Sequence, residues 1–114
     1  MKKMTLDPKT KQAARMFLEK IAAHYDLMFA ILFGSRARST HHPDSDADIA
    51  VILKGKPANF IDTKLALDDF AFDVLLDTEI RIQPLPIWIE EWDHPDKYRN
   101  PRLLENIRRE GIIL

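Results

Sequence analysis

Two aspartates separated by a single residue are the clearest candidates for chemistry in this chain. Asp46 and Asp48 flank Ala47 at the start of the apolar run Ile49–Val51. If this run is a β-strand, side chains two residues apart project from the same face, about 6.5 Å apart along the chain. Two such carboxylates repel each other, and a divalent cation relieves that repulsion. Mg²⁺ suits the pair because water and substrate phosphates complete its coordination. A solvent-facing pair at a strand edge is the alternative.

A short turn upstream of these aspartates has the composition of a phosphate-binding loop. Gly34 and Ser35 follow the continuous apolar run Leu27–Phe33. Glycine allows a sharp turn and the close approach of a ligand, and backbone amides exposed at the start of a helical turn bind anions. Arg36 and Arg38 add positive charge, and a guanidinium can hold phosphate oxygens in a bidentate manner. Ordinary surface arginines are the alternative for both.

Three further polar residues lie between the two features. Ser45 directly precedes Asp46, where it is either a turn residue or a further contact to a nucleotide. His41 and His42 are adjacent, and no third ligand stands at a recognisable spacing from them. Two neighbouring loop histidines of this kind are typically solvated, so we do not predict a zinc site there.

The order of these motifs resembles that of the minimal nucleotidyltransferases of the DNA polymerase β superfamily, which are often paired with a HEPN-domain partner. The family pattern is Gly-Ser, a variable stretch, and Asp-x-Asp followed by apolar residues. Here the pattern is Gly34-Ser35, the stretch 36–45, and Asp46-Ala47-Asp48. The resemblance implies an α+β nucleotidyltransferase fold like the palm of polymerase β, with Gly34 and Ser35 holding the triphosphate.

The same resemblance implies roles for the other motif residues. Asp46 and Asp48 would bind Mg²⁺ and act as the catalytic residues, and Arg36 and Ser45 would join the nucleotide-binding residues. In the two-metal manner, one ion accompanies the departing pyrophosphate while the other activates the attacking hydroxyl. The implied reaction transfers a nucleoside monophosphate, AMP from ATP, to an acceptor.

A chain of this size lacks space for an acceptor domain of its own. The resemblance therefore predicts a protein partner or a homodimer that completes the cleft. A HEPN-domain protein is the partner that the family implies, with this chain as the antitoxin of a toxin–antitoxin pair. AMP transfer onto that protein is then the expected reaction.

One feature departs from the family pattern. The family places a third acidic residue on the strand after the long helix, where it completes the metal site and can take the proton from the nucleophile. Here that strand offers Arg81 and Gln83, and Asp73 would substitute only if residues 71–76 were a strand. Either activity is weakened or lost, or an acid from elsewhere completes the site. This departure leads to an alternative function, a catalytically degenerate nucleotide-binding module that neutralises a HEPN-type toxin by complex formation.

The elements that must position these residues follow from apolar periodicity and from helix-capping signals. We expect a helix over 9–24 opened by Asp7-Pro8, strands over 27–33 and 46–53, a helix over 60–77, an edge strand from Ile80 whose prolines interrupt its ladder, and a last helix from Asn100-Pro101 to Gly111. The fold class is α+β, a small mixed sheet covered by helices on one side.

The long helix over 60–77 has an apolar stripe and an acidic stripe. The apolar stripe comprises Ile61, Leu65, Phe72 and Leu76, broadened by Phe70, Val74 and Leu75. The acidic one comprises Asp62, Asp69, Asp73 and Asp77. In an amphipathic helix of this kind, the aspartates are expected to form the solvated face. Trp88 and Trp92 either pack in the core, which is the commoner fate, or anchor a partner.

Bulk composition sets outer bounds on function. The 114 residues, 46% of them hydrophobic and 31% charged, fit a single domain over 1–114. No apolar run approaches the roughly 20 residues of a membrane span, and Met1–Thr5 lack the apolar segment of a secretory signal, so we expect a cytoplasmic protein. The absence of cysteine excludes thiol chemistry, and a net charge of -1 makes binding to long nucleic acid unexpected.

Overall fold

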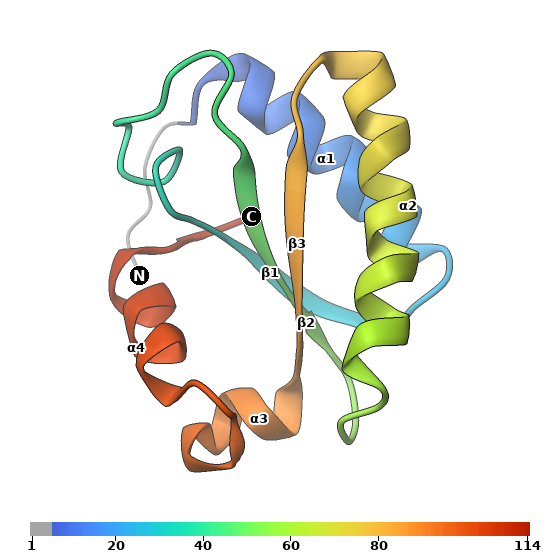
Figure 1. Ribbon diagram of the computed structural model, residues 1–114, viewed down its shortest axis with the longest axis vertical. Coiled ribbons are helices and arrows are strands. Elements are labelled where there is room, and N and C mark those ends of the chain that lie inside the picture. The colour runs from blue at the N-terminus through green and yellow to red at the C-terminus, as the bar shows by residue number, and fades with distance from the viewer. Residues whose placement is uncertain (1–5) are drawn as a thin grey trace.

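The structure is a computed structural model that describes residues 6–114; the expectation about a leader at Met1–Thr5 lies outside them. The elements in chain order are α1 Pro8–Ala22, β1 Leu27–Phe33, β2 Ala47–Leu53, α2 Phe60–Thr78, β3 Ile82–Trp88, α3 Ile89–Asp93, the 3-10 helix η1 Pro95–Lys97, α4 Pro101–Glu110 and β4 Ile112–Ile113 (Figure 1).

The strands form one mixed sheet in the order β3-β2-β1-β4. β1 is antiparallel to both β2 and β4, whereas β2 and β3 are parallel and are connected through α2. In this register Phe33 pairs with Asp48, and Asp48 pairs with Gln83. The last residue of β1 therefore lies beside the first residues of β2 and β3, at one end of the strands. The motif residues lie at this end. The α+β prediction is confirmed.

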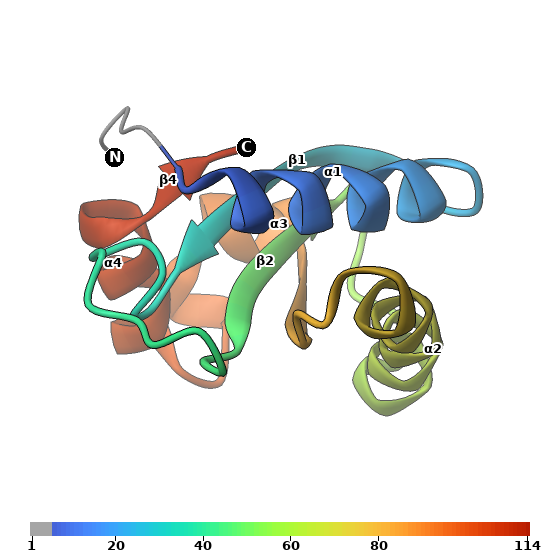
Figure 2. The same ribbon diagram turned by 90° about the horizontal axis from the view of Figure 1, so that it is seen from above.

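Helices cover both faces of the sheet, not one face as the sequence predicted. Alternate strand residues supply two separate cores, because successive side chains point to opposite faces. The core under α1 and α2 includes Phe17, Leu32, Ile49, Val51, Val74 and Trp88. The core under α3 and α4 includes Ile31, Ile52, Ile87, Trp92, Leu104 and Ile107. Figure 2 shows α2 and α4 on opposite sides of β2.

Both proline-containing helix starts are built as predicted. The Asp7 side chain accepts a hydrogen bond from the Thr10 amide at 3.0 Å and caps α1. The Asn100 side chain accepts one from the Leu103 amide at 3.2 Å and caps α4. In each case proline follows the cap, where its missing N–H has no helical partner to lose.

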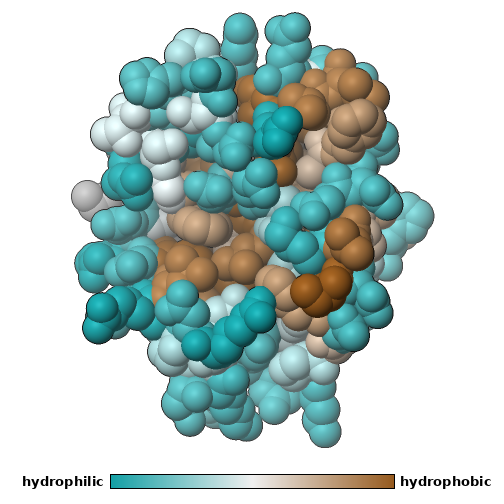
Figure 3. Space-filling view, in the orientation of Figure 1, coloured by the Kyte–Doolittle hydropathy of each residue, from teal (hydrophilic) through white to brown (hydrophobic). Residues whose placement is uncertain are grey.

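The aspartates of α2 are exposed as predicted, but the apolar stripe is exposed as well. The stripe that the sequence assigned to the core is exposed: Ile61 by 62%, Leu65 by 58%, Phe72 by 57% and Leu76 by 68%. The helix instead buries Thr63, Leu67, Ala71 and Val74 on its other side, and of these the sequence had placed only Val74 with the apolar stripe. At 100° per residue these two sets lie on roughly opposite sides of the helix. The exposed stripe is therefore a surface feature, visible as brown side chains over α2 in Figure 3.

β3 is an edge strand, as predicted, but its prolines do not interrupt it. Pro84 and Pro86 both lie within β3 and both stay in register with β2. Residues two apart direct their backbone groups to the same side, so the two nitrogens that lack a hydrogen face the free edge. The short elements α3, η1 and β4 were not predicted. Trp88 and Trp92 are both buried, which confirms core packing. No helix in the described part of the chain is long and apolar enough to span a bilayer.

Candidate functional site

Gly34 and Asp48 are brought together at the edge of the sheet. β1 ends at Phe33, the partner of Asp48, and Gly34 then turns the chain with a φ of +75°. A Cβ atom added at Gly34 would lie 2.3 Å from the Asp48 Oδ2 atom. A larger residue would therefore displace the carboxylate as well as strain the backbone. The turn predicted to hold phosphate therefore lies directly against Asp48, the second aspartate of the predicted metal pair.

Gln83 stands where the third carboxylate was expected. It pairs with Asp48 across the parallel β2–β3 ladder, and its Nε2 atom donates a hydrogen bond to Asp46 Oδ2 at 3.3 Å. Strand alternation places Asp48 and Gln83 on the face that α3 and α4 cover, since Ile52 and Ile87 belong to that core. The side chain at the expected third position is therefore an amide that donates to Asp46, and Arg81 is exposed just before β3.

The electrostatics of the pair favour a cation. Burial raises the pKa of Asp48 above its ordinary value, and the neighbouring charge of Asp46 raises that pKa further. The positive charge of Arg38 acts in the opposite direction and lowers the pKa of Asp48. A carboxylate that is partly desolvated and faces a second carboxylate gains most from a bound cation.

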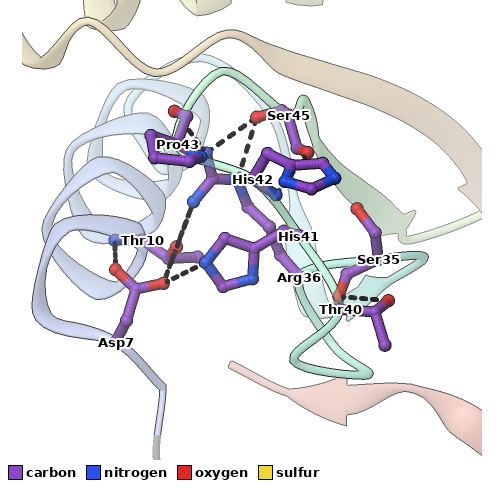
Figure 4. A network of polar contacts seen from close by, with 9 residues as sticks. All are labelled: Asp7, Thr10, Ser35, Arg36, Thr40, His41, His42, Pro43 and Ser45. Atoms are coloured by element: carbon purple, nitrogen blue, oxygen red, sulfur yellow. Dashed lines mark hydrogen bonds and ion pairs between the residues drawn. The ribbon is translucent and has the colours of Figure 1, made fainter.

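The loop between Gly34 and Asp46 is held by Arg36 (Figure 4). This side chain is 5% exposed, and its Nε and NH2 atoms donate to the Ser45 carbonyl at 3.0 and 2.7 Å. Its NH2 atom also donates to the Pro43 carbonyl at 3.3 Å, and its NH1 atom donates to the Thr10 hydroxyl at 2.9 Å. Because protein acceptors occupy these donors, Arg36 fixes the loop. Its nucleotide-binding role stays a prediction that these bonds argue against.

Asp7 ties the same loop to the start of α1. Its Oδ2 atom lies 3.3 Å from His41 Nε2 and 3.8 Å from Arg36 NH1, and it accepts a short hydrogen bond from the Thr10 hydroxyl. Burial raises the pKa of Asp7, but the hydrogen bonds from Thr10 and the charges of His41 and Arg36 lower it overall. Sequence reasoning missed this contact, because it assigned Asp7 to capping alone and His41 to solvent.

The remaining predicted site residues occupy different positions in this loop. The Ser45 hydroxyl accepts a hydrogen bond from the His42 amide at 2.8 Å, as expected of a turn residue. The Ser35 carbonyl accepts from the Thr40 amide at 3.0 Å and closes the turn after Gly34. Arg38 is exposed and lies 3.5 Å from Glu110. Arg38 is thus the arginine whose charge reaches Asp48, although Arg36 was the stronger sequence candidate.

The two carboxylates of the site fit one divalent ion and provide few protein ligands for a second ion. Asp46 and Asp48 supply carboxylate oxygens from the same strand start, which is a ligand type that Mg²⁺ prefers. Within residues 6–114 no cluster of three or more His, Cys, Asp or Glu side chains forms a metal site. A single Mg²⁺ completed by water and phosphate oxygens is compatible with these residues. The two-ion arrangement stays a prediction.

An open pocket lies between α2 and the start of β3. Its volume is about 310 Å³, and its lining includes Phe72, Leu75, Arg81 and Gln83. The pocket joins an exposed aromatic ring and a guanidinium to the amide that contacts Asp46. The pocket reaches Gln83, but neither Asp46 nor Asp48 lines it.

The family of the chain follows from comparison with known proteins. Residues 17–86 match the polymerase β nucleotidyltransferase family, and this segment contains the turn, both aspartates and Gln83. The chain therefore belongs to that family of nucleotidyltransferases.

One relative and one solved structure are similar to the chain. A candidate protein adenylyltransferase of Methanocaldococcus jannaschii is 38% identical over 87 residues, which are 75% of this chain and 58% of that protein. The chain thus spans little more than half the length of that relative. The crystal structure of a candidate nucleotidyltransferase from Sulfolobus solfataricus has the same fold, with a TM-score of 0.57 and 20% identity over 96% of this chain and 89% of that one.

Proposed function

We propose that this protein is a magnesium-dependent nucleotidyltransferase that transfers AMP from ATP to a hydroxyl group of a partner protein. Family membership supports nucleotidyl transfer, and the similarity to a candidate protein adenylyltransferase favours AMP and a protein acceptor. By its resemblance to minimal nucleotidyltransferases, a HEPN-domain protein is the partner of choice, in a toxin–antitoxin pair.

The observation that carries this proposal is the contact between Gly34 and Asp48. Only a residue without a side chain allows the turn to lie against the carboxylate, because a Cβ atom would come within 2.3 Å of Oδ2. Amides of such a turn attract phosphate oxygens, and the adjacent carboxylates attract a cation that phosphate also binds. The two features therefore suit a metal-bound polyphosphate better than either ligand alone.

The reaction balances as a single displacement at the α-phosphorus. The acceptor oxygen forms a bond to that phosphorus, and the bond from it to the oxygen that bridges to the β-phosphate breaks. Pyrophosphate leaves with the electron pair of the broken bond. Bound Mg²⁺ supplies charge neutralisation for the phosphate oxygens. Asp46 and Asp48 hold the ion, and the Gly34–Ser35 turn orients the phosphates.

Gln83 limits the rate that this site can reach. A neutral amide cannot accept the proton of the attacking hydroxyl, so that proton leaves to water. General bases typically contribute about 10²–10⁴-fold to a rate, and this contribution is absent at Gln83.

The position of the label in ATP distinguishes AMP transfer from phosphoryl transfer. The protein and a purified HEPN-domain partner are incubated with Mg²⁺ and ATP labelled at the α- or the γ-phosphate. We expect partner labelling from α-labelled ATP only, and loss of that labelling in Asp46→Asn. Asp44→Asn is the matched control, since Asp44 is an exposed aspartate two residues earlier. Labelling from γ-labelled ATP would instead indicate phosphoryl transfer, and no labelling under either condition would reject the enzyme proposal for that acceptor.

A second candidate function is a catalytically degenerate module that neutralises a HEPN-type toxin by complex formation. The amide of Gln83 at the third position favours it. In this case Asp46→Asn leaves both binding of the toxin and protection of cells intact. Loss of protection in Asp46→Asn, with binding retained, would exclude neutralisation by binding alone.

A further inference from the structure

The exposed stripe on α2 has no partner within the described chain. Ile61, Leu65, Phe72 and Leu76 recur at helical spacing and are all more than half exposed. They span fifteen steps of an α-helix, or about 22 Å. Figure 3 shows that they form brown patches along α2. An apolar surface arranged in a line along one helix suits the apolar groove of a partner better than it suits water.

Acidic residues flank this stripe on one side. Asp62, Asp69 and Asp73 follow the stripe around the helix by about a quarter turn, at 100° per residue. The other flank carries Lys64 and Asp68, which form an ion pair with a 2.7 Å separation. Two α2 helices packed antiparallel on each other would bring the acidic flanks together. Antiparallel self-pairing of α2 is therefore disfavoured by like charges.

An apolar groove lies on the other side of α1. It has a volume of about 870 Å³ and runs between α1 and β4, with Leu18, Leu27, Ile113 and Leu114 in its lining. Along α1 its lining extends from Lys11 to Ala22, or about 17 Å. The groove thus accepts a helix laid parallel to the axis of α1.

The groove lies where a third helix of the same layer would pack. α2 packs against α1, and the groove residues Lys11, Arg15, Leu18 and Glu19 belong to α1. The α1 wall of the groove carries two cations at one end and Glu19 at the other. A helix with an acidic flank fits the cationic end of that wall, and α2 carries such a flank.

We propose that this groove binds α2 of a second copy of the chain. Leu65, Phe72 and Leu76 enter the groove, because they span eleven residue steps, or about 17 Å. Asp69 and Asp73, four residues apart, then approach Lys11 and Arg15, which have the same spacing on α1. The contact joins different surfaces of the two copies, so one copy keeps a free stripe and the other keeps a free groove. Such a head-to-tail contact generates either a closed ring or an open chain.

Two variants, each with one disrupted surface, test this arrangement. Leu65→Glu/Phe72→Glu disrupts the stripe, and Arg15→Glu/Ile113→Glu disrupts the groove, at residues that are all exposed. Lys56→Glu, in the exposed loop after β2, is the matched charge control. Circular dichroism and thermal unfolding confirm that each variant is folded. Light scattering after size exclusion then gives the mass as concentration rises.

The expected masses distinguish head-to-tail from symmetric assembly. The wild type and Lys56→Glu rise above the monomer mass of 13.3 kDa with concentration, whereas each double variant stays monomeric. A mixture of the two double variants forms one species of twice the monomer mass. The intact groove of the stripe variant binds the intact stripe of the groove variant, and no further surface is available. Each variant alone weakens association by about 100-fold or more.

Three results would overturn the proposal. The first is a wild type that stays monomeric at every concentration. The second is a groove variant that still dimerises while the stripe variant does not, which would indicate symmetric α2 pairing. The third is a mixture of folded variants that remains monomeric although the wild type assembles.

Discussion

Replacing Gln83 by glutamate tests the structural account of the aspartate pair most directly. In the present structure the Gln83 Nε2 atom donates to Asp46 Oδ2 at 3.3 Å. Gln83→Glu keeps the length and shape of the side chain but replaces the donor with a charged oxygen. The metal-free protein then holds three carboxylates around one point. We expect it to lose stability without metal and to gain affinity for metal.

The size of the loss follows from the distance. Two unit charges about 3.3 Å apart repel by about 5 kcal/mol at an effective dielectric constant of about 20, and by about 1 kcal/mol in bulk water. Both side chains are half-buried, so an intermediate value applies. Including about 1 kcal/mol for the lost hydrogen bond, the free energy of unfolding falls by about 3 kcal/mol. For a chain of this length, the Tm falls by about 10 °C.

Thermal unfolding with and without Mg²⁺, together with calorimetric titration of the ion, measures both effects. Gln83→Met is the control, because it removes the hydrogen bond without adding charge. We expect it to cost about 1 kcal/mol and to leave metal affinity unchanged. In Gln83→Glu, the dissociation constant for Mg²⁺ falls by about 10-fold or more, since ligand charge sets affinity for hard cations. Equal Tm values and equal Mg²⁺ affinities for the two variants would refute the placement of Gln83 beside Asp46.

Three further variants probe the same edge of the sheet. Asp48→Asn should raise the Tm of the metal-free protein at neutral pH by several degrees, because burial and the neighbouring carboxylate raise the pKa of Asp48 and make its ionised form costly. Added Mg²⁺ should then no longer raise the Tm, whereas an undiminished metal effect would exclude Asp48 as a ligand. Gly34→Ala should cost about 3 kcal/mol in urea unfolding, against about 1 kcal/mol for Gly55→Ala. Both glycines have positive φ, but an added Cβ meets nothing within 4 Å at Gly55, so equal costs would contradict the contact at Gly34. Burial raises the pKa of Asp7, but hydrogen bonds from Thr10 and nearby positive charges lower it overall. A lowered folded-state pKa gives stability that is present above the ordinary pKa and is lost as pH falls through the folded value, from about pH 5 downward. Asp7→Asn should therefore flatten the acid limb of the stability curve, and identical acid limbs would count against the Asp7 contacts.

The local part of the site could be predicted from the sequence because it depends on short-range rules. Alternation along a strand put Asp46 and Asp48 on one face, and a glycine after a buried strand indicated a tight turn. The two strands are neighbours along the chain and pair with each other in an antiparallel manner. The end of β1 therefore had to meet the start of β2, which placed Gly34 beside Asp48.

The orientation of α2 could not be predicted in the same way. Periodicity identifies a stripe, but it does not tell which of two stripes faces the sheet. The larger side chains, such as Phe72 and Leu76, form the exposed stripe, whereas Ala71 and Val74 form the buried one. Small residues allow α2 to pack closely against β3 and α1, and this preference arises only from tertiary contacts.

Arg36 shows a second limit of reading charge from sequence. A guanidinium two residues after a glycine turn fits phosphate binding and loop fixation equally well, because both need several acceptors. The carbonyls of Pro43 and Ser45 are acceptors that no side-chain pattern reveals. Only the path of the loop shows that they converge on Arg36. The positive charge of Arg38, in contrast, lowers the pKa of Asp48. The path of the loop also determines how close Arg38 comes to Asp48.

The amide at position 83 connects stability with metal binding at this site. Without metal, the hydrogen bond from Gln83 to Asp46 compensates part of the repulsion between the two carboxylates. A third carboxylate would increase that repulsion and require an ion to offset it. The chain therefore keeps a loop and a carboxylate pair that are stable before the ion binds, at the cost of a proton acceptor. This arrangement is compatible with slow AMP transfer to a partner and with neutralisation of a toxin by binding. Metal affinity and partner labelling must therefore both be measured on Gln83→Glu. A Gln83→Glu variant that binds Mg²⁺ more tightly and labels the partner faster would identify the amide as the feature that restrains catalysis.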